Sequence, residues 1–229
     1  YAVKSIAVKY GITPCFMAKP SQGIPGCSGH IHISIVDKDG KNMFARELKD
    51  ENAKYAEIAN LSDTGRYFLA GLLEGVADVL PIFAPTINSY KRLIQNFWAP
   101  VTVSWGHDNR LASIRLITPP TCKAAATRLE VRIPGADANP FYVMAAIIAL
   151  GYRGIKNKIE IPLPPLATGN NSSGPLNQGI RLARTLREAN DRFIRKESVA
   201  REIFEDEFVD YFGATREHEI RLWDEAVTD

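Results

Sequence analysis

The sequence has few cysteines and no membrane-length hydrophobic run. Only three cysteines, Cys15, Cys27 and Cys122, occur among 229 residues, and no two of them form a C-x-x-C motif. A scattered, odd-numbered set does not build a disulfide framework and fits a reducing compartment. No apolar stretch approaches the roughly 20 residues that span a bilayer, and the start has no secretory-signal pattern. We therefore expect a cytoplasmic protein without a membrane partner.

Several common functional signatures are also absent. The chain carries 28 basic and 26 acidic residues, a net charge of +2, and no basic run interleaved with aromatic residues, so we expect no nucleic-acid partner. Neither a P-loop nor a Rossmann glycine motif with its acidic residue is present. The residues make no case for a Ser-His-Asp triad. Hydrophobic residues make up 45% of the chain, enough for one substantial core.

Helical patterns stand at both ends and in the middle of the chain. Residues 1–10 have helical spacing and end at Gly11, and residues 65–83 form a broad apolar stripe that we expect Pro81 to terminate. Asn139 and Pro140 suit the start of another helix, whose apolar sequence predicts burial on most sides. The Asp39-Gly40 pair predicts a hairpin turn.

The last third of the chain changes character. Residues 160–175 are rich in Pro, Gly, Asn and Ser and predict a loop, after which charged amphipathic helices run to the end. The chain begins at Tyr1 inside one helical pattern and stops at Asp229 inside another, which suggests a fragment of a longer protein.

The stretch GCSGHIHIS, residues 26–34, predicts a strand with two different faces. Alternation places Ile31 and Ile33 on one face and His30, His32 and Ser34 on the other. Imidazoles carry little charge at neutral pH and are the commonest nitrogen ligands of metals. A half-exposed sheet whose histidines hydrogen-bond to neighbours is the alternative.

Three further segments repeat this alternation. They are VTVSW at 101–105, SIRLI at 113–117 and RLEVRI at 128–133. If these strands lie side by side, arginines, a glutamate and histidines converge on one concave surface. Such a surface suits an anionic ligand neutralised by a metal and guanidinium groups, as in phosphoryl transfer. Each strand taken alone is equally compatible with a sheet facing solvent.

Five segments together resemble the catalytic domain of glutamine synthetase, in the order in which that family has them. They are KPSQGIPGCSGHIHIS (19–34), NSYKRL (88–93), the NR to SIR segment (109–115), RLEVRIPGADANPF (128–141) and GIKNKI (154–159). The resemblance implies an α+β fold: an antiparallel-sheet, barrel-like catalytic domain with packed helices. Residues 1–229 would be part of one such domain, with a strand-rich active-site region at 1–159, a loop and C-terminal helices at 160–229, and the family's N-terminal domain outside this chain.

The resemblance implies an ATP-dependent ligase that uses glutamate, ammonia or an amine, and ATP as co-substrate, with Mg²⁺ or Mn²⁺ as cofactor. It also implies a homo-oligomeric ring. His30 and Glu130 match metal ligands of the family, and His32, Ser34, Arg110 and Arg115 match residues at the nucleotide, Arg110 also lying near the transferring group as a catalytic residue. Gly26, Arg92 and Arg132 match residues that contact glutamate.

The chain departs from the family pattern in three ways. Pro25 replaces an asparagine before Gly26, where the family's GSG reads Gly26-Cys27-Ser28, and the family's other metal-binding glutamates would precede Tyr1. Trp98 stands where glutamine synthetases usually carry a catalytic glutamate. Three interpretations follow: a ligase of this family using ammonia or an organic amine, a non-catalytic structural relative, or a nucleotide-binding module without ligation.

Overall fold

The structure is a computed structural model that describes residues 1–95, 97, 99–166 and 180–227. Its strands are β1 (Ile31–Ile33), β2 (Trp105–His107), β3 (Ile114–Ile117) and β4 (Arg128–Val131). Its α-helices are α1 (Ala2–Lys9), α2 (Asp63–Gly75), α3 (Leu80–Phe83), α4 (Ile87–Tyr90), α5 (Pro140–Asn157), α6 (Leu186–Ile194), α7 (Val199–Ile203) and α8 (Asp206–Glu225). Two short 3₁₀ turns lie at Ala56–Ile58 and Ala124–Ala126.

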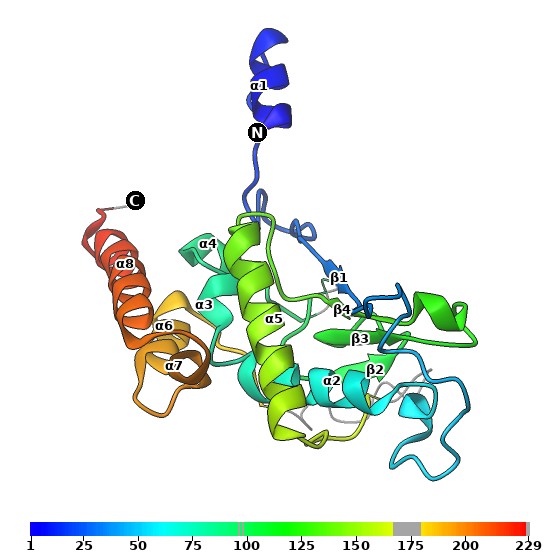
Figure 1. The fold of residues 1–229 in the computed structure, drawn as a ribbon. Helices are drawn as coiled ribbons and strands as arrows, with labels where there is room; N and C mark the ends of the chain where they lie inside the picture. Colours follow the sequence, from blue (N-terminus) through cyan, green and yellow to red (C-terminus); the bar gives the residue numbers. More distant parts are fainter. Residues whose placement is uncertain (96, 98, 167–179, 228–229) are drawn as a thin grey trace.

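The described strands form one sheet in the order β1-β4-β3-β2 (Figure 1). β4 is antiparallel to both β1 and β3, whereas β2 runs parallel to β3. The α+β class with helices packed beside a small sheet is therefore confirmed, and one pairing departs from the all-antiparallel expectation. Alternation in sequence fixes which face a side chain takes, but not the direction of the neighbouring strand.

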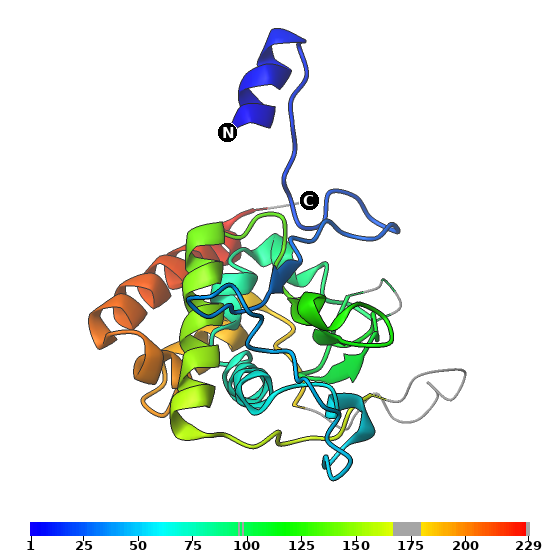
Figure 2. The same ribbon diagram turned by 45° about the vertical axis from the view of Figure 1, so that its right-hand side comes forward.

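Helices α2 and α5 pack together against the core, and Figure 2 shows α2 nearly end-on beside the long α5. Glycines permit this close approach. A Cβ added at Gly154 would lie 2.0 Å from the Tyr67 carbonyl oxygen, and one at Gly71 would lie 2.2 Å from that of Leu150. The inward side chains of the strands, such as Ile114 and Leu129, join the same core.

The helix beginning at Asn139 is confirmed, with its side chain accepting a hydrogen bond from the Phe141 amide. The expectation that this helix is buried on most sides is wrong. Phe141, Ile148 and Tyr152 expose 74%, 57% and 62% of their surface and lie on one face of α5. An apolar composition shows that a helix has much to bury, but not which faces this part of the chain covers.

Two other predictions were corrected, and a third is confirmed in the part of it that the structure describes. The helical stripe at 65–83 is divided, because α2 ends at Gly75 and Pro81 lies in the first turn of α3, where its missing N–H costs no intrahelical bond. In the 101–105 segment only Trp105 belongs to a strand, β2. Residues 160–166 are irregular as predicted, and the rest of that predicted loop falls largely outside the described residues.

The N-terminal helix α1 is confirmed and is followed by Gly11 with a φ of 65°. It buries no side chain and projects away from the other elements (Figures 1 and 2). None of the helices in the described ranges combines the length and the hydropathy that crossing a bilayer requires.

Candidate functional site

The loop before β1 is held against the loop after β4. The Gly29 amide donates to the Pro134 carbonyl at 2.8 Å, and Ser28 forms a bridge with Gly135. The Cys27 amide donates to the Ala18 carbonyl at 2.7 Å. These backbone bonds fix the chain that leads into His30 and β1.

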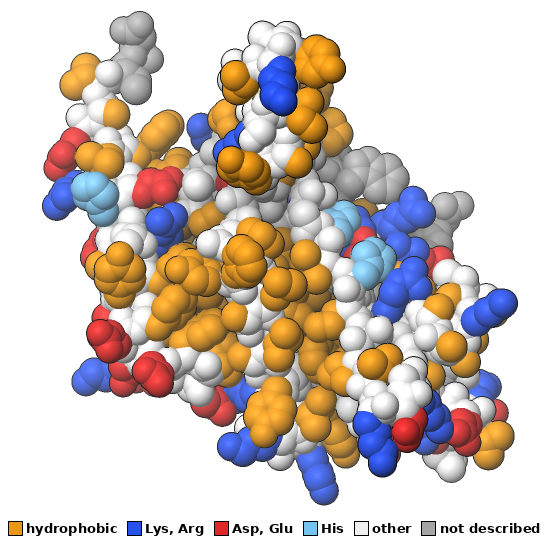
Figure 3. All heavy atoms as spheres, turned by 45° about the horizontal axis from the view of Figure 1, so that its top comes forward, with side chains coloured by type: hydrophobic (Ala, Val, Ile, Leu, Met, Phe, Trp, Pro, Cys, Tyr) orange, Lys and Arg blue, Asp and Glu red, His pale blue; other side chains and the backbone are white. Residues whose placement is uncertain are grey.

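Within β1 the side chains alternate as predicted. Ile31 and Ile33 pack against the core, whereas His32 and Ser34 are exposed on the opposite face. Figure 3 shows histidine side chains with basic side chains around them on one open face of the molecule.

The strand register brings three polar residues into one row across the sheet. His32 pairs with Glu130 between β1 and β4, and Arg115 pairs with Glu130 between β3 and β4. Residues directly opposite each other in neighbouring strands point to the same face. The predicted convergence of histidine, glutamate and arginine on one surface is therefore confirmed.

Glu130 is the centre of this cluster and is only 3% exposed. Its Oε1 accepts from the Arg132 guanidinium at 2.6 Å and lies 3.0 Å from the His30 Nδ1. Its Oε2 accepts from the Arg115 guanidinium at 2.9 Å. One carboxylate thus ties together residues from β3, β4 and the start of β1, which we call the Glu130 cluster: His30, His32, Arg115, Glu130 and Arg132.

The surroundings set the charge of these groups. Burial alone would raise the pKa of Glu130, but the hydrogen bond from Arg115 and the charge of Arg132 hold that pKa below its usual value. Burial, with the positive charge of Arg132, lowers the pKa of His30 to about 4. At neutral pH Glu130 is ionised and His30 is neutral, the protonation states in which each can coordinate a metal ion.

Two charged residues that we did not assign to the site hold its members in place. Asp108, with a φ of 48°, accepts from the Arg115 Nε at 2.8 Å. Arg128 donates from its Nε to the His32 Nδ1 at 3.0 Å. Arg128 could have been found from the alternation of RLEVRI, whereas nothing local in the sequence pairs Asp108 with Arg115.

Arg92 and Gly26 lie against one another beneath the cluster. Arg92 is 4% exposed, and its guanidinium donates to the backbone carbonyls of Ile133 at 2.7 Å and Arg132 at 2.9 Å. A Cβ at Gly26 would lie 2.4 Å from the Ala18 carbonyl oxygen and 2.7 Å from the Arg92 Cγ. In this structure the Arg92 side chain therefore stabilises the backbone at Arg132. The contact of Arg92 with glutamate stays a prediction.

Arg110 and Ser34 make no side-chain contact with the cluster among the residues that the structure describes. Arg110 lies exposed in the connection between β2 and β3, and within the described ranges its guanidinium has no hydrogen bond or ion pair. Ser34 is exposed beyond the end of β1. Trp98 lies outside the described residues.

The Asp137 carboxylate fixes the start of α4, the short helix that precedes Arg92. Asp137 accepts through its Oδ2 from the hydroxyls of Thr86 at 2.9 Å and Ser89 at 2.7 Å. Thr86 and Ser89 also form a reciprocal cap at the start of α4. Asp137 is thus a further positioning residue that the sequence did not indicate.

The donor set fits part of a divalent-metal site. His30 and Glu130 come within reach of one another, but among the residues that the structure describes no three His, Cys, Asp or Glu side chains gather as a metal cage. Hard cations such as Mg²⁺ take six or more ligands, chiefly oxygen atoms. Three arginines at the cluster, Arg115, Arg128 and Arg132, outnumber the two carboxylates of Asp108 and Glu130, which favours a ligand with several negative charges.

Comparison with known proteins gives a consistent set of relatives. The family model for the catalytic domain of glutamine synthetase matches residues 1–229. Type-1 glutamine synthetase 2 of Dictyostelium discoideum is 41% identical, over 99% of this chain and 41% of its own. Glutamate–isopropylamine ligase of a Pseudomonas species is also 41% identical, over 96% of this chain and 45% of its own.

A further relative and a solved structure also match this chain. Gamma-glutamylethanolamide synthetase of Streptomyces coelicolor is 35% identical, over 99% of this chain and 44% of its own. The solved structure of apo GmaS without ligand matches with a TM-score of 0.81 and 28% identity, over 99% of this chain and 49% of that one. The chain thus spans less than half the length of each of these relatives.

Proposed function

This chain belongs to the glutamine synthetase catalytic-domain family, and from that membership we propose that the longer protein is an ATP-dependent ligase joining glutamate to an amine. The observation that carries the proposal is the convergence of His30, Arg115 and Arg132 on the buried Glu130. Removing Arg115 or Arg132 would leave a buried carboxylate short of partners, and such clusters are costly to maintain for structure alone. This argument favours a ligase over a non-catalytic relative.

The proposed reaction has two steps. An oxygen of the glutamate side-chain carboxylate attacks the γ-phosphorus of ATP, and the bond from that phosphorus to the β,γ-bridging oxygen breaks, giving ADP and γ-glutamyl phosphate. The amine nitrogen then attacks the acyl carbon, phosphate leaves with the oxygen that came from glutamate, and the nitrogen gives up a proton. The product is a γ-glutamyl amide.

The chain's own residues would act mainly by holding charge in place. Arg115, oriented by Asp108 and Glu130, would face negative charge on the transferring phosphoryl oxygens, together with Arg110. Arg132 would orient a glutamate carboxylate, for which its planar guanidinium is suited. The exposed side chains of His32, on β1, and Ser34, just beyond its end, would contact the nucleotide.

His30 and Glu130 would contribute to holding Mg²⁺ or Mn²⁺, with further ligands from outside the described residues. Such an ion supplies neutralising charge for the phosphate oxygens when bound. The ring of subunits, the cytoplasmic location and the assignment of all of residues 1–229 to one domain remain predictions drawn from the family and the composition.

For the amine we propose an organic amine as a second candidate beside ammonia. Two of the similar proteins bear names that specify isopropylamine and ethanolamide products or substrates. In this chain Trp98 replaces the glutamate that glutamine synthetases usually carry, and an indole offers apolar surface and a cation–π face in place of a negative charge.

Oxygen transfer tests the reaction class directly. The full-length protein is incubated with ATP, an amine and glutamate whose side-chain carboxylate is labelled with oxygen-18. We expect labelled oxygen in the phosphate released, because the bridging oxygen of the acyl phosphate comes from glutamate. Phosphate without label, released at the same rate with and without glutamate, would reject the ligase and support a nucleotide-binding module with hydrolysis only.

A further inference from the structure

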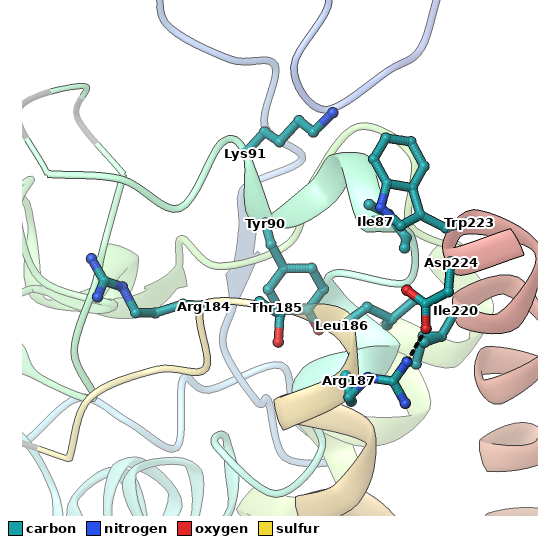
Figure 4. Close-up of a pocket in the computed structure, with 10 residues that line it drawn as sticks. All are labelled: Ile87, Tyr90, Lys91, Arg184, Thr185, Leu186, Arg187, Ile220, Trp223 and Asp224. Carbon is teal, nitrogen blue, oxygen red and sulfur yellow. Dashed lines mark hydrogen bonds and ion pairs between the residues drawn. The ribbon is translucent and has the colours of Figure 1, made fainter. Parts of the chain in front are cut away.

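A cavity of about 420 Å³ lies between α4, the start of α6 and the end of α8 (Figure 4). Its volume falls in the range of about 300–1,000 Å³ that is usual for small-molecule sites. None of its lining residues belongs to the Glu130 cluster. The reaction proposed above gives this cavity no role.

The walls of the cavity are apolar and include buried side chains. Ile87 of α4, Leu186 of α6 and Ile220 of α8 supply aliphatic walls, and Leu186 and Ile220 are only 2% and 4% exposed. Tyr90 and Trp223 add aromatic surfaces, of which the Trp223 ring is 53% exposed. A planar ring can be buried here by offset stacking on the indole.

Positive charge predominates at the edge of the cavity. Lys91, Arg184 and Arg187 line it with a single carboxylate, that of Asp224, which pairs with Arg187. Within the described ranges neither the Lys91 ammonium nor the Arg184 guanidinium has a carboxylate partner, and the Lys91 ammonium lies 4.9 Å from the centre of the Trp223 ring. Figure 4 shows Lys91 and Trp223 on one side of the cavity and the Arg187–Asp224 pair on another, with Arg184 directed outward.

The start of α6 adds backbone donors. The Thr185 hydroxyl caps the Glu188 amide at 3.1 Å, and the Glu188 carboxylate accepts from the Arg184 amide at 2.9 Å. The amides of Leu186 and Arg187 belong to the first turn and have no partner within the helix. The N-terminus of this nine-residue helix therefore presents N–H groups and a positive dipole end to the cavity.

An unsatisfied hydroxyl lies in the same wall. Tyr90 is 5% exposed, lines the cavity, and its hydroxyl has no hydrogen-bond partner among the residues that the structure describes. In Figure 4 this hydroxyl points toward Thr185 and Leu186, at the start of α6. Buried hydroxyls are normally paired, so this group is an unsatisfied donor in the wall of the cavity.

We propose that this cavity binds a small aromatic carboxylate. The ring would lie against Trp223 and the aliphatic walls, and the carboxylate would meet Lys91 and the first-turn amides of α6. A cationic ligand would be repelled by the Lys91 ammonium, and a purely apolar one would leave Lys91 without a new partner. The site borders α4, and Lys91, which follows α4, directly precedes Arg92. Binding of a ligand in this cavity does not depend on the proposed reaction.

The test uses the full-length protein and para-fluorophenylacetate, followed by fluorine NMR in the presence of saturating glutamate and ADP. These ligands keep the probe out of the proposed active site. We expect saturable binding, weakened about tenfold or more in Lys91→Gln and in Trp223→Ala. Both side chains are exposed at the rim, and circular dichroism checks that the variants fold.

Two controls distinguish binding in this cavity from non-specific electrostatic attraction of the probe to the protein surface. Arg181→Gln removes an exposed positive charge that does not line the cavity and should leave the affinity within about twofold. Para-fluorobenzylamine, of similar shape and opposite charge, should bind about tenfold more weakly or worse. No binding at about 5 mM probe, equal affinity in parent and Lys91→Gln, or preference for the amine would each overturn the proposal.

Discussion

Glu130 and Arg115 stand opposite each other in neighbouring strands, and the Arg115 guanidinium lies 2.9 Å from the Glu130 Oε2. Asp108 accepts from the other edge of the same guanidinium. Arg115 is thus fixed between two carboxylates, and burial is outweighed by these bonds, so that the pKa of Arg115 is raised. The arginine remains charged and oriented for a phosphate ligand throughout the physiological range.

Asp108→Asn tests whether this orientation serves the reaction. Asp108 is partly exposed, so we expect the free energy of unfolding to fall by less than about 1 kcal/mol. We expect kcat to fall about tenfold, because a less oriented Arg115 stabilises the transferring phosphoryl less well. The matched change Asp191→Asn, at an exposed position on α6, should leave kcat unchanged. Equal kcat values in both variants would show that Asp108 does not orient Arg115 for the reaction.

Arg132→Lys tests the proposed contact with glutamate. A lysine offers a point charge in place of a planar pair of donors, so we expect KM for glutamate to rise about tenfold or more. KM for ATP should change less than about threefold. Arg153→Lys, which alters an arginine paired with Glu74 and Glu202 on the helices, serves as control. A larger effect on ATP than on glutamate would assign Arg132 to the other substrate.

Gly26→Ala tests the packing beneath the site. The new methyl group would lie within 3 Å of the Ala18 carbonyl oxygen and of the Arg92 Cγ, so loop and arginine must both shift. We expect the free energy of unfolding, measured in urea, to fall by about 1–3 kcal/mol, with a rise in KM for glutamate. The neighbouring exposed Cys27→Ala should be neutral in both measurements. If Gly26→Ala left both the free energy of unfolding and KM for glutamate unchanged, the loop would be shown to accommodate the methyl group without cost.

Trp98→Glu tests the choice of amine. If the indole faces the amine, the parent protein should turn over isopropylamine or ethanolamine faster than ammonium at equal concentration, since apolar area on the amine is buried at about 25 cal/mol per Å². The glutamate variant should shift the preference toward ammonium. Tyr211→Glu, at a position that is 73% exposed on α8, controls for added charge. Faster turnover of ammonium by the parent would return the protein to glutamine synthesis.

The sequence predicted which side chains share a face better than it predicted how they pair. Alternation in HIHIS and RLEVRI correctly placed His32 and Glu130 on a polar face, because the period of a strand is a local property. The register that sets Arg115 beside Glu130, and the parallel direction of β2, depend on residues far apart in the chain. The same holds for Arg92, whose backbone contacts exist only once the loop after β4 has folded against α4.

Site residues outside the strands were harder to predict for a related reason. Asp108 reaches Arg115 only because it takes a positive φ in a short connection, and Asp137 meets the hydroxyls of α4 from 48 or more residues away. Neither role has a signature in the neighbouring sequence. The exposed face of α5 likewise follows from what surrounds the helix and not from its composition.

Formation of γ-glutamyl amide by the full-length protein and by Glu130→Gln tests the central claim most directly. The product is identified by mass spectrometry after incubation with glutamate, ATP, Mg²⁺ and an amine. We expect the parent to form amide in equal amount to ADP and phosphate, and the variant to lose at least about 100-fold in rate. Because glutamine keeps an acceptor for Arg115, the stability loss should stay near 2 kcal/mol, leaving the variant folded. No amide from the parent with any amine, or an undiminished rate in Glu130→Gln, would contradict the account.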